Sequence, residues 1–230
     1  MGDLIGSLYD WLQNIDFQLN LAAEFVGVVL SIPLSIWIAS LLDRRVERRR
    51  QKGALLAVVR VSQHELHYFA RDFPTKMMEE GASYPKTSVG VFRTTKQSVV
   101  NAELAIRDII SNAQAQLSGQ IDTNLLQTMF RLRYQWRTLT EFLVFEDAYF
   151  LHNVAEGKSS DEMISMRIEG IRNVIEWIHR HNIEIANLVS AKAAREVERD
   201  EPSLETASLR QIISTILEYR IKQIGEEIRW

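Results

Sequence analysis

The sequence contains no cysteine, and only four prolines and ten glycines occur among its 230 residues. Without cysteine the chain cannot form a disulfide, and it lacks the ligands of iron–sulfur clusters, the thiolates of zinc sites and a cysteine nucleophile. Proline and glycine interrupt helices most often, and here they fall mostly between segments that carry apolar residues at helical spacing. This distribution predicts long helices with few breaks.

Charge is absent from one long stretch of the chain. Residues 25–42 are eighteen uncharged, mostly apolar residues. At about 1.5 Å per residue a helix of that length spans about 27 Å, close to the hydrocarbon thickness of a bilayer. With the apolar residues just before it, this stretch predicts a transmembrane helix over residues 19–42, and a buried helix of a soluble protein is the alternative.

Lysine and arginine are also missing from residues 1–43, whereas six basic residues follow directly: Arg44, Arg45, Arg48, Arg49, Arg50 and Lys52. Basic flanks stay on the cytoplasmic side of a span. We therefore expect a single-pass protein of the inner (cytoplasmic) membrane, with its N-terminus outside and its C-terminus in the cytoplasm. The basic cluster should contact lipid headgroups. Its lack of interleaved aromatic residues and the net charge of −3 argue against a nucleic-acid partner.

Five small residues stand four apart within the predicted span: Ala23, Gly27, Ser31, Ser35 and Ala39. Such a stripe lets two helix backbones approach closely, so it predicts a homo-oligomer that packs through the membrane helix. If the subunits surrounded a central space, Glu24 would form a carboxylate ring at its outer mouth, as in cation pathways.

The remainder of the chain shows repeated four-three apolar spacing and no segment with strand periodicity. The predicted fold class is all-α, with one N-terminal transmembrane helix followed by a cytoplasmic bundle of about four to five helices. The predicted divisions are an external interfacial segment at residues 1–18, the span at 19–42, a basic juxtamembrane helix at 43–73 that ends before Pro74, and the bundle at 87–230. The bundle is also a candidate surface for a protein partner.

Two polar residues interrupt the apolar stripes of the predicted bundle. A buried carboxylate is costly unless it is paired, so we expect Glu146 to face Arg167 across a helical hairpin. A functional acid is the alternative. Asn182 should be either a polar core residue that sets the register of the packed helices or a contact at the edge of the bundle.

Neither of two metal-like spacings is complete. His64 and His67 share a helix face but lack a third ligand, and Glu176 with His179 is only one of the two motifs that a di-iron bundle requires. We therefore expect no metal and no cofactor.

The segment from Arg172 and Asn173 to His179 resembles the ribonuclease motif of HEPN domains, in which an arginine and a polar residue precede a histidine. A single-pass helix joined to such a bundle also looks like the accessory membrane proteins of type VI CRISPR systems. The resemblance implies either RNA cleavage by paired domains, with Arg172 and His179 as catalytic residues, or a pore in antiviral defence. The alternative is a solvated arginine and histidine beside a packed stripe.

Three hypotheses follow, and the sequence does not decide whether the protein is an enzyme. The leading one is a membrane-anchored assembly protein that self-associates through its transmembrane helix. The second is a pore-forming or membrane-disrupting defence effector with a HEPN-like domain. The third is a HEPN-type ribonuclease.

Overall fold

The computed structural model describes residues 15–79, 87–117 and 123–227, and within residues 15–32 it describes only the side chain of Ser31. All regular structure in the described part of the chain is helical, which confirms the all-α prediction. The elements in order are α2 (Ile15–His67), the π-helix η1 (Tyr68–Asp72), α3 (Phe73–Met78), α4 (Ser88–Leu117), α5 (Thr123–Val144), α6 (Ala148–Ala155), α7 (Ser160–Val189), α8 (Ala191–Arg199) and α9 (Thr206–Glu227).

The chain divides into two compact units, Met1–Arg50 and Gln51–Trp230. Helix α2 runs through the boundary, so the later part of the predicted juxtamembrane helix belongs to the second unit. Among the residues that the structure describes, no helix offers a stretch of the length and apolarity that a membrane crossing requires. The side chains of residues 1–30 lie outside the described part of the chain. This range includes the predicted interfacial segment 1–18 and three residues of the predicted span, Ala23, Glu24 and Gly27.

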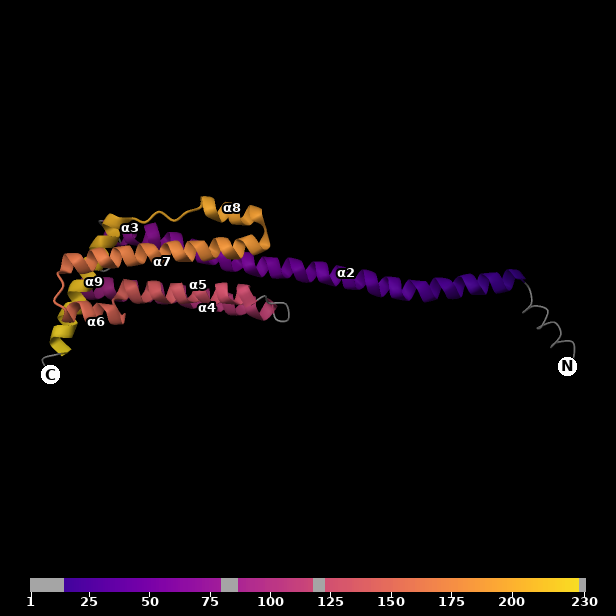
Figure 1. The fold of residues 1–230 in the computed structure, drawn as a ribbon, viewed down its shortest axis with the longest axis horizontal. Helices are drawn as coiled ribbons and strands as arrows, with labels where there is room; N and C mark the ends of the chain where they lie inside the picture. The colour runs from indigo at the N-terminus through magenta and orange to yellow at the C-terminus, as the bar shows by residue number, and fades with distance from the viewer. Residues whose placement is uncertain (1–14, 80–86, 118–122, 228–230) are drawn as a thin grey trace. The chain divides into compact units, whose positions relative to one another are not determined.

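The second unit is a helical bundle. Helix α5 packs against α4 and α7, and α9 packs against α3, α4 and α7 (Figure 1). Lys96 near the start of α4 forms an ion pair with Glu146, just after the end of α5, so α4 and α5 are antiparallel neighbours. Helix α8 folds back along α7 after the short break at Ser190.

The core confirms the predicted stripes because the residues at four-three spacing are the ones that lose solvent contact. Helix α7 buries Ile164, Ile168, Ile171, Ile175, Ile178 and Ile185, and α9 buries Leu209, Ile213 and Leu217. Ser159 caps the start of α7, since its hydroxyl accepts a hydrogen bond of 3.3 Å from the backbone amide of Glu162. That bond satisfies one of the free amides at the start of α7.

The predicted pair of Glu146 and Arg167 is wrong. Helix α5 ends at Val144, and Phe145 turns the chain with a φ of 55°. This turn removes Glu146 from the helical stripe and brings in Asp147, whose side chain caps α6 and forms the ion pair with Arg167. Glu146 pairs with Lys96 at the surface instead.

The prediction that the helix ends before Pro74 is also wrong. The chain continues through the π-helix η1 into α3, and Pro74 lies in the first turn of α3. Proline has no amide hydrogen, so Pro74 cannot donate a hydrogen bond to the Ala70 carbonyl one turn before it. The backbone amide of Glu205 donates to the Ala70 carbonyl instead, at 2.7 Å. This bond fixes the chain just before α9.

Candidate functional site

Helix α7 carries the two candidate catalytic residues of the sequence, two turns apart. Its buried face, which includes Ile171, Ile175 and Ile178, packs into the core. Arg172 is exposed beside that face, whereas His179 is only 9% exposed. Both side chains line one cavity of about 350 Å³, which is completed by Ile175, Glu176, Arg180, Ile183, Glu201, Pro202 and Leu204. The structure therefore brings Arg172 and His179 to one site.

His179 contacts the side chain of Gln63, which is only 5% exposed. The Nδ1 atom of His179 lies 3.3 Å from Gln63 Nε2 and 3.4 Å from Gln63 Oε1. Gln63 Oε1 also accepts a hydrogen bond of 3.1 Å from Asn182 Nδ2. The buried amide therefore joins α2 to two positions of α7, and Asn182 is a buried polar core residue as predicted.

The same glutamine extends the network toward the surface. Gln63 Nε2 donates to the backbone carbonyl of Asp200 and lies 3.2 Å from His67 Nε2. His67 Nε2 lies 3.1 Å from a carboxylate oxygen of Asp200. We call Gln63, His67, His179, Asn182 and Asp200 the Gln63 cluster. It ties the end of α8 to α2 and α7.

Burial lowers the pKa of His179 below its ordinary value, and nearby His67 acts in the same direction. The carboxylates of Glu201, Asp200 and Glu198 oppose this shift. A histidine has an ordinary pKa of about 6.5, so His179 is neutral at neutral pH. A neutral imidazole can accept a proton, which is the state that a general base requires.

The other predicted site residues are spread over the first part of α2. Ser31, Ser35 and Ala39 of the small-residue stripe are exposed, and Ala23, Gly27 and Glu24 lie outside the described side chains. All six residues of the basic cluster are exposed: Arg44, Arg45, Arg48, Arg49, Arg50 and Lys52. Within the described ranges, no three histidine or carboxylate side chains are placed to hold a metal ion.

Sequence reasoning missed Gln63 and Asp200. Gln63 follows Ser62, a polar residue on an apolar stripe, and both are buried. That adjacent pair was the available signal, because two polar residues on the inner face of a helix need partners within the core. Asp200 gave no signal, since an aspartate just before a proline-containing loop is an ordinary surface residue.

No family model, curated protein or solved structure matches this chain.

Proposed function

We propose that this chain is a membrane-anchored helical protein that self-associates through its transmembrane helix. The anchor would cover residues 19–42, with the N-terminus outside and the bundle in the cytoplasm. The observation that supports it best is the exposure of large apolar side chains along α2. Leu34, Ile36, Trp37, Ile38, Leu41 and Leu42 are each between 36% and 65% exposed.

Successive residues on a helix are turned by about 100°, so Leu34, Trp37, Ile38, Leu41 and Leu42 share one broad face. Ile36 points to a different face. A helix that is apolar on several faces is typical of a membrane span or of the interior of a large protein. Exposed apolar patches of this kind mark contact with a membrane or a partner.

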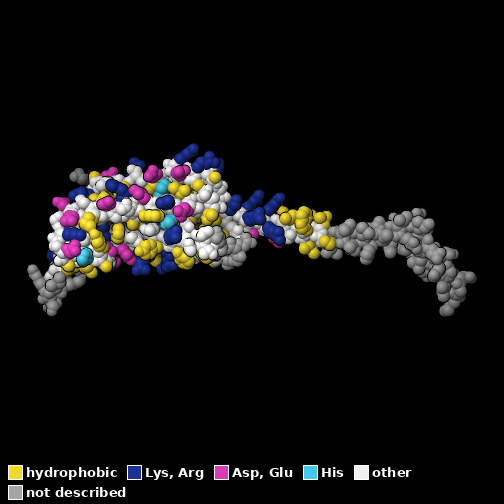
Figure 2. Space-filling view, viewed as in Figure 1, with side chains coloured by type: hydrophobic (Ala, Val, Ile, Leu, Met, Phe, Trp, Pro, Cys, Tyr) yellow, Lys and Arg dark blue, Asp and Glu magenta, His cyan; other side chains and the backbone are white. Residues whose placement is uncertain are grey.

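The basic residues that follow the apolar segment support the proposed orientation, with the bundle in the cytoplasm. Figure 2 shows the hydrophobic side chains of this part of α2 directly beside a group of Lys and Arg side chains. Exposed arginines next to an apolar helix match the cytoplasmic flank of a span, where anionic headgroups attract each of them by about 1 kcal/mol.

Self-association is supported by the small-residue stripe. Lipid tails are as apolar as leucine, so membrane helices associate through close packing and hydrogen bonds rather than through burial from water. Ser35 and Ala39 are exposed on α2, where a second helix could approach. The larger Ile36 and Trp37 lie beside them and would pack around the contact.

We expect Ser31→Leu to weaken self-association in bilayers by at least about tenfold, because a leucine separates the two backbones. Resonance energy transfer between labelled full-length chains in liposomes measures this change. Ser40→Leu is the matched control. It makes the same substitution on the same helix but off the stripe, at a residue whose hydroxyl bonds only to the Trp37 carbonyl, at 2.8 Å, within its own helix. Equal association of both variants and the wild type would rule out the stripe as the interface.

We propose RNA cleavage as a second candidate function, because Arg172 and His179 line one cavity. The neutral His179 would act as the base that activates a ribose hydroxyl, and Arg172 would neutralise charge on the phosphate. The arrangement also sets a requirement. His179 is buried against Gln63, so the substrate must reach it through the cavity.

For a ribonuclease, His179→Gln and Arg172→Gln should each lower the rate of RNA cleavage by at least about a hundredfold. Glutamine preserves hydrogen bonding to Gln63, so circular dichroism should show an unchanged fold. Arg93→Gln, which removes an exposed charge on α4, serves as the control. Cleavage that persists in His179→Gln would eliminate this candidate. Measuring dye leakage from liposomes in the same samples would separate it from membrane disruption.

A further inference from the structure

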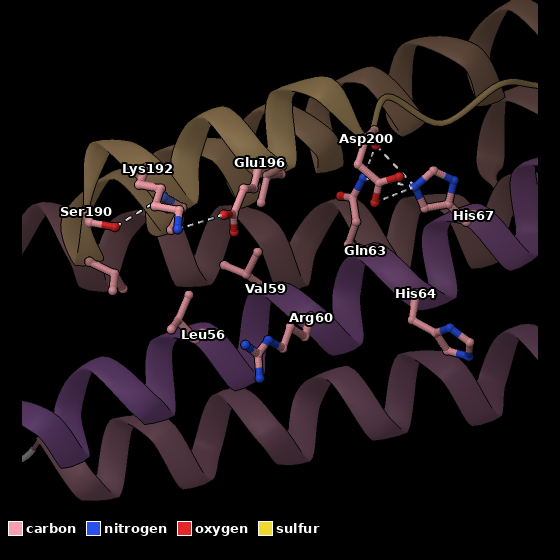
Figure 3. A pocket seen from close by; sticks show the side chains of 13 residues that line it. Leu56, Val59, Arg60, Gln63, His64, His67, Ser190, Lys192, Glu196 and Asp200 are labelled. Carbon is pink, nitrogen blue, oxygen red and sulfur yellow. Dashed lines mark hydrogen bonds and ion pairs between the residues drawn. The ribbon is translucent and has the colours of Figure 1, made fainter.

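A second cavity lies entirely within the unit Gln51–Trp230 and has no role in the functions proposed above. Its volume is about 570 Å³, within the range of about 300–1,000 Å³ that is usual for small-molecule sites. It opens between the last turns of α2, the end of α7 and α8 (Figure 3). A cavity of this size can hold an organic molecule rather than only water.

The middle of the cavity is apolar. Helix α2 contributes Leu56 and Val59, and α8 contributes Ala193 and Val197. Helix α8 has no fully buried residue, and Ala193 and Val197 are only partly covered against the core. The apolar side of α8 is therefore partly open to the cavity, where an apolar group would gain contact.

Positive charge lies around one part of the cavity. Arg60 is exposed, and within the described ranges it takes part in none of the ion pairs. Lys192 is 3.8 Å from Glu196, with the two side chains 85% and 67% exposed, so this contact is weak. Ser190 and Lys192 also place the first turn of α8 at the cavity, and the start of a helix carries partial positive charge.

The two carboxylates that line the cavity, those of Glu196 and Asp200, each have a partner. Figure 3 shows Ser190 and Lys192 at one end and Gln63, His67 and Asp200 at the other, with Arg60 between them. Asp200 lies 3.1 Å from His67 and Glu196 lies 3.8 Å from Lys192, whereas neither carboxylate forms an ion pair with Arg60.

We propose that this cavity binds a small anionic amphiphile, a carboxylate or phosphate group joined to an apolar chain. Arg60 would hold the anion, assisted by Lys192 and the start of α8, and the apolar chain would lie against Leu56, Ala193 and Val197. An inorganic anion alone would leave the apolar surface uncovered. A neutral apolar molecule would make no charge-assisted contact with Arg60. The ligand class therefore follows from the two surfaces together.

The test is equilibrium dialysis of radiolabelled decanoate against the full-length chain in phosphatidylcholine nanodiscs, with empty nanodiscs subtracted. We expect saturable binding that weakens about tenfold in Arg60→Gln, because a charge-assisted contact is lost. Arg93→Gln removes an equivalent exposed charge on α4 and should bind as the wild type does. Ala193→Trp should fill the cavity and abolish binding while circular dichroism remains unchanged.

Two competitors identify the ligand chemistry. Decanol should compete at least about tenfold less well than unlabelled decanoate, since it lacks the charge that Arg60 holds. Inorganic phosphate should not compete at millimolar concentration, because it lacks the apolar chain. The proposal is overturned if decanoate does not bind saturably, if Arg60→Gln binds it as tightly as the wild type, or if decanol competes equally.

Discussion

Replacing Arg167 with methionine should lower the free energy of unfolding by about 3–5 kcal/mol, because it leaves a largely buried carboxylate without its partner. Arg167 on α7 forms an ion pair with Asp147, and the two side chains are only 6% and 9% exposed. The guanidinium also lies over the rings of Phe142 and Phe145, at 5.0 and 4.3 Å from their centroids. Urea denaturation of the full-length chain in mild detergent, followed by circular dichroism, measures the loss.

A double variant separates the lost partner from the lost packing. Asp147 also accepts a hydrogen bond of 3.1 Å from the Phe150 amide at the start of α6. Asparagine keeps this cap but removes the charge. Arg167→Met with Asp147→Asn should therefore be more stable than Arg167→Met alone. If the second substitution restores nothing, the unpaired charge is not the cause of the loss.

Trp136→Ala should cost about 3–5 kcal/mol of unfolding free energy, as expected when a large buried side chain leaves a cavity. Trp136 on α5 is 1% exposed, and its ring lies 6.4 Å from that of Phe69. Its Nε1 atom donates a hydrogen bond of 3.1 Å to the buried hydroxyl of Ser62. The side chain thus joins α5 to α2 and η1. The same urea titration measures the change.

The chain provides a matched control in Trp177 on α7, which is 47% exposed. Trp177→Ala removes the same side chain from the surface and should cost less than about 1 kcal/mol. Trp136→Phe should fall between the two, because it retains much of the packing but leaves Ser62 without its donor. Equal losses at positions 136 and 177 would contradict the placement of Trp136 in the core.

The helices could be predicted because their signals are local. The isoleucines of α7 repeat at a helical interval, and Ser159 with Glu162 marks where that helix begins. The break after α5 could not be predicted, because Phe145 adopts a left-handed conformation that only a few per cent of non-glycine residues show. Without that turn, a continuous helix places Glu146 rather than Asp147 opposite Arg167.

Only part of the candidate site could be predicted, again because the signals in the sequence are local. Periodicity placed His179 and Asn182 close to a buried face, but it cannot identify the residue on the facing helix. That residue is Gln63, 116 positions from His179 and 119 from Asn182. Partners at such distances are set by how the helices pack, and no local rule of spacing reports them.

Pro74 shows how a missing donor can direct the chain over a long distance. Any other residue at this position would carry an amide hydrogen one turn from the Ala70 carbonyl, to which the amide of Glu205 donates. Proline removes that local donor. A residue usually regarded as a helix breaker thus favours a tertiary contact with the distant segment that leads into α9.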